Sequence, residues 1–156
     1  MAICQRLKEF LDSRGIPYET IQHREAFTSQ EVAAASHVSG KDIAKVVMVK
    51  RGDRLAMAVL PAACKVGVDR LVHLLGTSDI ALAREQEFSG LFGDCDTGAM
   101  PPFGNLYGLD VYLDDELASR SRLIFQAGNH HELVSMAYGD FERLVQPKVA
   151  ELCSHA

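Results

Sequence analysis

The chain has 156 residues, of which 47% are hydrophobic and 24% are charged, and its formal net charge is −5. This length fits one domain over residues 1–156 with its own core, and the composition excludes a disordered chain. The acidic balance disfavours a protein that coats long stretches of DNA or RNA, because such proteins are usually basic.

The sequence shows no sign of a membrane span, an export signal or a disulfide framework. No apolar run approaches the roughly 18 residues that a membrane helix needs, and residues 1–15 lack the apolar stretch of a signal peptide. We therefore expect a cytoplasmic protein that contacts no membrane. None of the four cysteines forms a C-x-x-C pair, and we expect reduced thiols at Cys4, Cys64, Cys95 and Cys153.

The first half of the chain predicts two helices and a hairpin. Apolar residues at i, i+4, i+7 and i+8 favour an amphipathic helix that Gly15 can end, and Thr28 to Glu31 fit a capping box. The turn at Arg51 to Asp53 predicts a hairpin with a loop of three or more residues. In chain order, the predicted elements are a helix over 2–14, a strand over 18–22, a helix over 31–38, and strands over 43–50 and 55–60.

The second half mixes strands and helices without a regular βαβ alternation. This mixture predicts an α+β fold, or a mixed α/β fold with a largely antiparallel sheet. The last helix follows Gly139 and is interrupted or restarts at Pro147. The other predicted elements are a helix over 69–75, a strand over 80–83, a helix over 84–90, a loop over 93–104, a strand over 109–113, a helical turn over 114–119, and strands over 122–126 and 133–137.

Lys45 lies in the middle of the apolar run over residues 43–50. Both faces of this strand are apolar, which predicts a central strand with a buried lysine. A buried ammonium is costly unless it has a counter-charge or reaches a cavity. Two interpretations remain open: Lys45 lies near the strand end and reaches water, or it binds an anion.

The loop from Asp94 to Gly104 combines two prolines with flanking glycines. Such a loop can direct several backbone N–H groups at one point, as a binder of a carbonyl or an oxyanion does. The alternative is a plain surface turn. Cys95 within it could be a thiol nucleophile, but a free cysteine is more often a small buried apolar residue.

The segment from Gly128 to Glu132 follows a predicted strand. Its adjacent histidines, His130 and His131, would point to opposite sides of a continuing strand, so at most one of them would face a given site. The segment is a polar binding loop in which one histidine binds substrate or moves a proton, or else a solvated turn. The other histidines have no metal-ligand spacing, and we expect neither a metal nor another cofactor.

Taken together in their order, these three features resemble the YbaK/ProX family of aminoacyl-tRNA editing domains. Lys45 in IAKVVMVK corresponds to the lysine of the family, and the run from Gly98 to Pro102 matches its G-x-x-x-P loop. The segment LIFQAGNHHELVSMAYGDFERLV resembles its closing strands and helix. The resemblance covers nearly the whole chain and implies a mixed, barrel-like sheet flanked by helices.

The resemblance implies a trans-editing deacylase that hydrolyses the ester of a mischarged small amino acid on the 3′ end of tRNA, without a metal. Its partners are the aminoacylated 3′ end and, as a further candidate, an aminoacyl-tRNA synthetase, but not DNA. The implied catalytic residues are Lys45, which would bind a phosphate, Gly98, whose backbone would hold the ester, and His130. The implied substrate-binding residues are Ala99, Met100, Pro101, Pro102, Gly104, Gly128 and Asn129.

Two points of the resemblance are open, namely the amino-acid specificity and whether His130 or His131 faces the pocket, which depends on a one-residue register. Members that clear cysteine carry an aspartate a few residues after the equivalent of Gly128, where this chain has Leu133 with Glu132 beside it. Specificity for cysteinyl-tRNA therefore does not follow. The alternative functions are a non-catalytic module that binds charged tRNA or a nucleotide, and an unrelated hydrolase that uses Cys95.

Overall fold

The computed structural model describes residues 4–26, 29–93, 95 and 99–154. Its main element is an eight-stranded mixed sheet in which seven strands follow the order β1-β8-β7-β2-β3-β6-β9, and β5 pairs with β2 off this path. The α+β, mixed-sheet prediction is confirmed. The strands are β1 (Tyr18–Gln22), β2 (Ile43–Arg51), β3 (Arg54–Pro61), β5 (Ile80–Leu82), β6 (Asp110–Asp114), β7 (Arg122–Gln126), β8 (Glu132–Ala137) and β9 (Lys148–Ala150).

The sheet contains both antiparallel and parallel pairs. The pairs β1–β8, β7–β8, β2–β3 and β2–β5 are antiparallel, whereas β2–β7, β3–β6 and β6–β9 are parallel. A separate antiparallel pair joins β4 (Lys65–Val66) to β10 (Cys153–Ser154). The pairings of the described strands form an open path from β1 to β9, with no pairing that closes it into a barrel.

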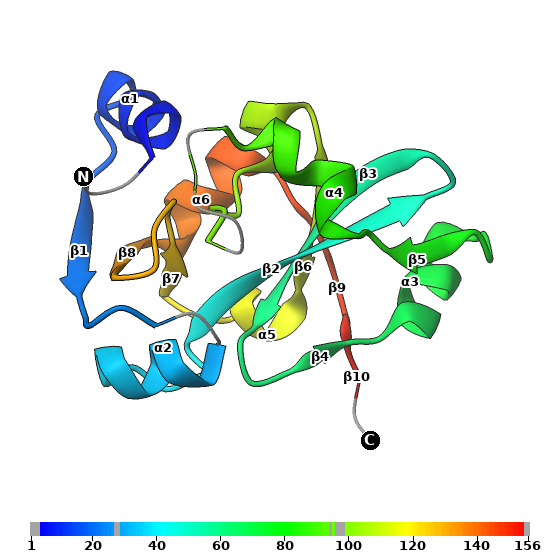
Figure 1. The fold of residues 1–156 in the computed structure, drawn as a ribbon, viewed down its shortest axis with the longest axis horizontal. Coiled ribbons are helices and arrows are strands. Elements are labelled where there is room, and N and C mark those ends of the chain that lie inside the picture. The colour runs from blue at the N-terminus through cyan, green and yellow to red at the C-terminus, as the bar shows by residue number, and fades with distance from the viewer. Residues whose placement is uncertain (1–3, 27–28, 94, 96–98, 155–156) are drawn as a thin grey trace.

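Helices cover both faces of the sheet, and β1 and α2 lie at the opposite end of the molecule from α3 and β5 (Figure 1). Leu7 and Leu11 of α1 and Phe141 of α6 belong to the core on one face, whereas α2 and α3 supply two smaller clusters on the other. None of the described helices is both long and apolar enough to cross a membrane. The helices are α1 (Gln5–Ser13), α2 (Ser29–Ser36), α3 (Val68–Leu75), α4 (Glu85–Phe88), α5 (Asp115–Ala118) and α6 (Tyr138–Val145), with 3₁₀ turns η1 (Ser89–Leu91) and η2 (Gly104–Tyr107).

Strand β2 lies at the centre of the sheet, as its apolar faces predict. Ala44 and Met48 point into the core that α1 and α6 cover, whereas Ile43 packs under α2 and Val49 under α3. This alternation follows from the two-residue period of a strand. Both faces of β2 are therefore buried under other elements.

One edge of β2 is paired along its length, but the other edge is divided between two strands. β3 pairs with residues 44–51 of β2. On the opposite edge, β7 pairs with Ile43 and Ala44, and β5 pairs with Val49 to Arg51. In the described part of the chain, no strand pairs with residues 45–48 on that edge. The side chains at 45–47 are only half-buried at this split in the sheet.

Two sequence predictions were wrong at turns. Arg51 pairs with Arg54, so the hairpin loop has two residues rather than three, and Gly52 provides the positive φ of +62° at its first position. The last helix does not restart at Pro147. It ends at Val145, Gln146 takes a left-handed φ of +52°, and β9 then pairs with β6.

A buried carboxylate joins the end of the chain to the sheet. Asp114 is fully buried, and its Oδ1 accepts hydrogen bonds from the backbone N–H groups of Leu152 at 2.7 Å and Cys153 at 3.1 Å. Its Oδ2 accepts from Glu116 N at 3.1 Å and so caps α5. One side chain therefore fixes the positions of β10 and α5 relative to β6.

Asp114→Ala removes the two oxygens that accept these three hydrogen bonds and leaves backbone N–H groups without partners. We expect a loss of at least about 2 kcal/mol in the free energy of unfolding, measured by urea denaturation. Asp115→Ala is the matched control, because Asp115 is the exposed neighbour in the first turn of α5. An equal loss for the two variants would contradict this role of Asp114.

Candidate functional site

Lys45 is the third residue of β2 and lies at the split in the sheet. Its backbone pairs with Leu60 of β3, and its side chain is half-buried. Among the residues that the structure describes, the ammonium has no hydrogen-bond or ion-pair partner. Burial lowers the pKa of Lys45, and Lys65 lowers it further, whereas the sulfurs of Cys64 and Cys153 act in the opposite direction. Lys45 is thus a partly desolvated cation that has no carboxylate partner within residues 4–26, 29–93, 95 and 99–154.

Gln126 of β7 is a second polar side chain at the split, and the sequence analysis did not identify it. The parallel register pairs Ala44 with Phe125, which places Lys45 and Gln126 one step further along their strands on a common face. The Nε2 atom of Gln126 is buried and has no hydrogen-bond partner among the described residues. An unsatisfied buried donor beside an unpaired cation can bind an anion or a carbonyl oxygen.

The turn at residues 127–131, between β7 and β8, joins three distant segments through backbone hydrogen bonds. Ala127 O accepts from Cys4 N, and Gly128 N donates to Ala99 O, both at 2.7 Å. His130 O accepts from Ala26 N at 2.9 Å. The turn therefore connects α1, the loop at residues 99–104 and the chain that leads into α2.

The polar side chains of this turn are mostly buried. Asn129 and His130 are buried, whereas His131 is half-exposed and donates its backbone N–H to Asn129 Oδ1 at 3.0 Å. The buried carboxylate of Glu132 accepts from Gln22 Nε2 at 2.6 Å and from Asn129 Nδ2 at 3.5 Å. The turn is therefore an ordered polar structure rather than a solvated one.

The loop at residues 99–104 is also buried, which excludes a plain surface turn over these residues. Met100 and Phe103 belong to the main core, and the Phe103 ring contacts the Phe125 ring at a centroid distance of 5.6 Å. A Cβ on Gly104 would lie 2.7 Å from Val111 Cγ2, so packing alone requires this glycine. Gly98 lies outside the described residues, and its contact with an ester stays a prediction.

The side chain of Cys95 is half-buried and packs against the main core. Its Sγ lies 3.7 Å from Tyr107 Oη. A neutral tyrosine hydroxyl is a hydrogen-bond partner and not a base that activates a thiol. The packing favours the interpretation of Cys95 as a small apolar residue over that of a nucleophile.

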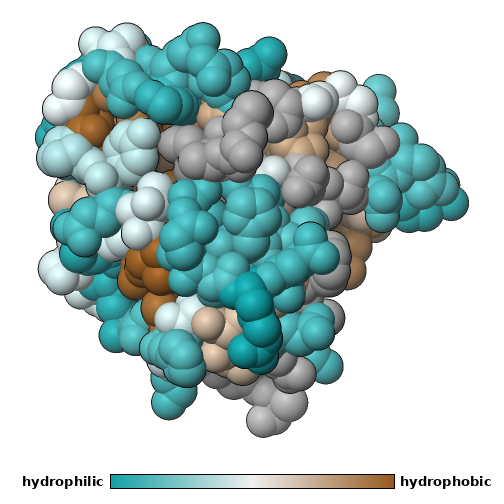
Figure 2. All heavy atoms as spheres, turned by 60° about the vertical axis from the view of Figure 1, so that its left-hand side comes forward, coloured by the Kyte–Doolittle hydropathy of each residue, from teal (hydrophilic) through white to brown (hydrophobic). Residues whose placement is uncertain are grey.

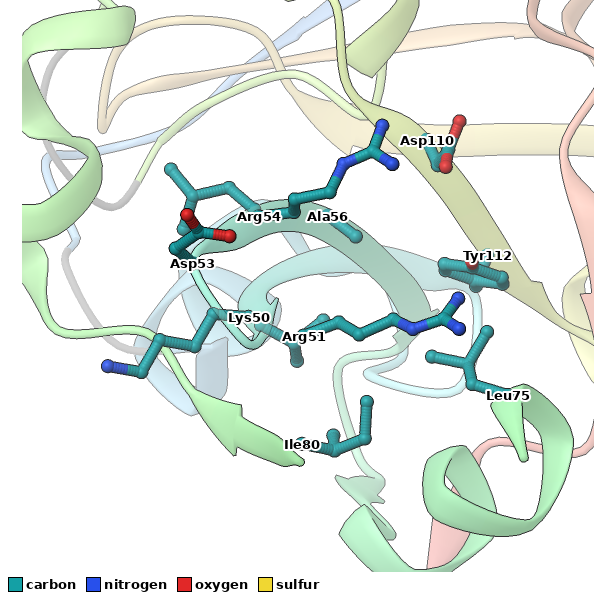
Figure 3. Close-up of a pocket in the computed structure, with 11 residues that line it drawn as sticks. Lys50, Arg51, Asp53, Arg54, Ala56, Leu75, Ile80, Asp110 and Tyr112 are labelled. Carbon is teal, nitrogen blue, oxygen red and sulfur yellow. The ribbon is translucent and has the colours of Figure 1, made fainter. Parts of the chain in front are cut away.

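A cavity of about 320 Å³ lies away from Lys45, at the tip of the β2–β3 hairpin. Tyr112 and Ile80 form part of its wall, and Arg51 and Arg54 extend along it (Figure 3). Neither guanidinium has an ion-pair partner within the described ranges. Arg51 is six residues from Lys45 along the strand, or roughly 20 Å, so this cavity is distinct from the site around Lys45.

Gly128 holds its place because nothing larger fits. Its φ is +112°, and an added Cβ would lie 2.8 Å from Cys4 Cβ and 3.0 Å from Cys4 N. Both the backbone conformation and the close approach of α1 therefore exclude a side chain.

We expect Gly128→Ala to destabilise the protein by more than the roughly 1–3 kcal/mol of backbone strain alone, measured by urea denaturation. Gly76→Ala isolates the strain, because Gly76 has a φ of +69° with no atom within 4 Å of the added Cβ. If the two variants lost equal stability, the contact with Cys4 would not constrain the turn.

Comparison with solved structures supports the fold. The chain is similar to the hypothetical protein APE2540, with 21% identity, a TM-score of 0.84, and coverage of 96% of this chain and 100% of that one. It is also similar to a candidate trans-editing enzyme for prolyl-tRNA synthetase, with 20% identity, a TM-score of 0.82, and coverage of 97% and 96%. No curated protein matches the chain.

Comparison with models of protein families identifies the family of the chain, whereas the similar structures show its fold alone. A model described as the aminoacyl-tRNA editing domain matches residues 23–144. This range includes β2 with Lys45, the loop at residues 99–104, and the 127–131 turn. The chain belongs to the aminoacyl-tRNA editing domain family.

Proposed function

We propose that this chain is a trans-editing deacylase that hydrolyses the ester between a mischarged small amino acid and the 3′ end of tRNA. Family membership supports aminoacyl-tRNA as the substrate class, and the similarity to a candidate trans-editing enzyme supports action on a tRNA released by a synthetase. A synthetase partner and a cytoplasmic location, where charged tRNA is used, belong to the same proposal.

The unpaired ammonium of Lys45 is the observation that carries this proposal. No carboxylate of the described residues pairs with this half-buried cation, which is unfavourable in the free protein, and a phosphate of the substrate would supply an opposite charge. Gln126 Nε2 adds a neutral donor at the same place. Lys45 would therefore bind the phosphate next to the terminal adenosine, with Gln126 beside it.

Hydrolysis of this ester requires positioning more than an activated nucleophile, since an aminoacyl ester is already reactive. The oxygen of a water attacks the carbonyl carbon, the C–O bond to the ribose breaks, and the ribose oxygen takes a proton. Backbone N–H groups of residues 98–100 would stabilise the developing oxyanion. His130, beside Gly128 and Asn129, would contact the substrate from the 127–131 turn.

Lys45→Ala removes the charge that we assign to the phosphate. We expect kcat/KM for deacylation to fall roughly 10- to 200-fold, the usual range for a charge-assisted contact. Lys45→Arg should restore the rate only in part, because a planar guanidinium does not replace a compact ammonium. The measurement is single-turnover hydrolysis of a set of mischarged tRNAs. Lys65→Ala is the control, because it removes an exposed lysine near Lys45.

Normal deacylation by Lys45→Ala would contradict the proposal. Binding of charged tRNA by the wild-type protein without turnover would instead support a non-catalytic binding module. Dialysis against a strong chelator should leave the rate unchanged, because no step described above uses a metal. A loss of rate that zinc restores would contradict the metal-independent mechanism.

Gln126→Met separates a substrate contact from a structural role. Because Nε2 is buried without a partner, replacement by an apolar side chain should maintain or raise stability in urea. Loss of one neutral hydrogen bond to the substrate should lower kcat/KM by roughly 2- to 10-fold. Unchanged activity in a folded Gln126→Met protein would remove Gln126 from the site.

A further inference from the structure

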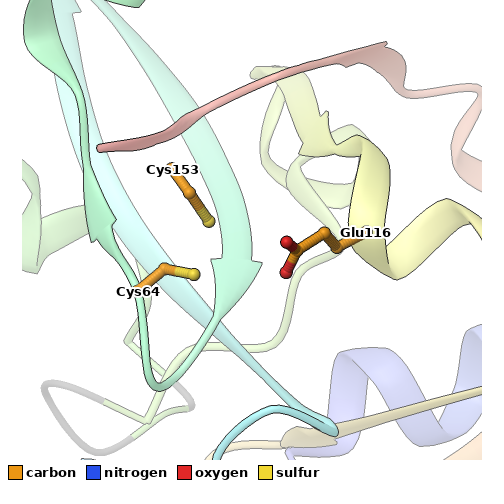
Figure 4. Close-up of side chains that lie close together, drawn as sticks. All are labelled: Cys64, Glu116 and Cys153. Carbon is orange, nitrogen blue, oxygen red and sulfur yellow. The ribbon is translucent and has the colours of Figure 1, made fainter. Parts of the chain in front are cut away.

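Two cysteines and a glutamate that are far apart in the sequence come together near the β4–β10 pair. Cys64 lies in the turn after β3, Glu116 in α5 and Cys153 in β10. Their two sulfurs and a carboxylate oxygen all lie within 4.8 Å of one another. Figure 4 shows the three side chains pointing toward a common centre. The proposed deacylation mechanism gives no role to these three residues.

We propose that Cys64, Cys153 and Glu116 bind a zinc ion. Two thiolates and a carboxylate are ligands that Zn²⁺ prefers, and softer sulfur ligands disfavour Mg²⁺ and Ca²⁺. Sulfurs bound to one zinc lie about 2.3 Å from the ion, and a carboxylate oxygen about 2.0–2.2 Å. Atoms that already lie within 4.8 Å of one another need only small side-chain movements to reach this geometry.

The surrounding structure fixes the backbone positions of the ligand residues before any ion binds. Asp114 accepts hydrogen bonds from the backbone N–H groups of both Cys153 and Glu116, so one buried carboxylate positions two of the three ligands. The β4–β10 pairing, in which Cys153 faces Val66, brings the chain after Cys64 to the same place. Such preorganisation reduces the conformational entropy that the ligands lose on binding.

Charged groups of both signs lie near the proposed zinc ligands. Zn²⁺ with two thiolates and one carboxylate carries a net charge of −1, and the ammonium of Lys45 interacts electrostatically with both cysteines. The carboxylate of Asp114 also acts on Cys153, so the site lies between a cation and a buried anion. Without an ion, burial raises the pKa of Cys153, so its thiol keeps its proton; binding releases this proton to water as the sulfur–metal bond forms.

Cobalt provides a direct test, because Co²⁺ replaces Zn²⁺ and its bonds to thiolates absorb light. The full chain is reduced, stripped with a chelator, freed of the chelator and titrated with Co²⁺. We expect one equivalent to produce a thiolate-to-cobalt band and the visible bands of a tetrahedral ion, and Zn²⁺ to abolish both. If the reduced wild-type protein shows no thiolate band, the proposal is overturned. It is also overturned if the reduced protein binds no cobalt and air oxidises Cys64 and Cys153 to a disulfide.

Variants identify the ligands. Cys64→Ser and Cys153→Ser should each lose at least half of the thiolate band, and Glu116→Gln should weaken cobalt binding at least tenfold while keeping a thiolate band. Cys95→Ser and Asp115→Asn are the controls, because Cys95 is another half-buried thiol and Asp115 is the exposed neighbour of Glu116. Loss of the band in Cys95→Ser, or its full retention in Cys64→Ser, would overturn the assignment.

A second measurement on the wild-type protein does not depend on whether the variants fold. Bound Zn²⁺ should slow alkylation of Cys64 at least tenfold and leave the alkylation rate of Cys95 unchanged, as read by peptide mass spectrometry. Equal rates for Cys64 with and without Zn²⁺ would overturn the proposal. Neither experiment measures deacylation, so the zinc site and the proposed function can fail independently.

Discussion

The desolvation of a single lysine at the centre of the sheet is the constraint on which the candidate site depends. Strand β2 is buried on both faces, yet its third residue is Lys45, whose ammonium has no ion-pair partner among the described residues. The sheet accommodates this cation because β7 and β5 pair with different ends of β2 and leave the middle of one edge open. The topology therefore places a half-buried cation at an edge of β2 that no described strand covers.

Backbone contacts, rather than side-chain ion pairs, hold the turn at residues 127–131 that follows Gln126. The 127–131 turn is hydrogen-bonded to Cys4, to Ala99 and to Ala26, so three segments depend on the conformation of five residues. Gly128 allows the closest of these approaches, because a Cβ there would collide with Cys4. A turn that is held in this way can present fixed backbone groups to a substrate without a catalytic triad.

Local patterns in the sequence predict much of this architecture, and non-local pairing explains the rest. The β2–β3 hairpin and α3 with its Gly76 end were predicted because their signals lie within a few neighbouring residues. β9 and the β4–β10 pair were missed, because short strands gain their stability from distant partners. Strand alternation predicted that Lys45 lies on a strand with two apolar faces, but it left open whether the side chain reaches water or binds an anion. The proximity of Gln126 to Lys45, and the convergence of the zinc ligands, exist only once the strands are paired.

The central claim is that Lys45 binds a phosphate of the substrate, and the most direct test is a thermodynamic cycle on binding. A non-hydrolysable 3′-alanylamido-adenosine is made with and without a 5′-phosphate, and its Kd is measured for the wild type and Lys45→Ala in the presence of a chelator. We predict that the phosphate strengthens binding to the wild type by roughly 10-fold or more, as a charge-assisted contact does. In Lys45→Ala the same phosphate should add little. An equal gain in both proteins would contradict the account.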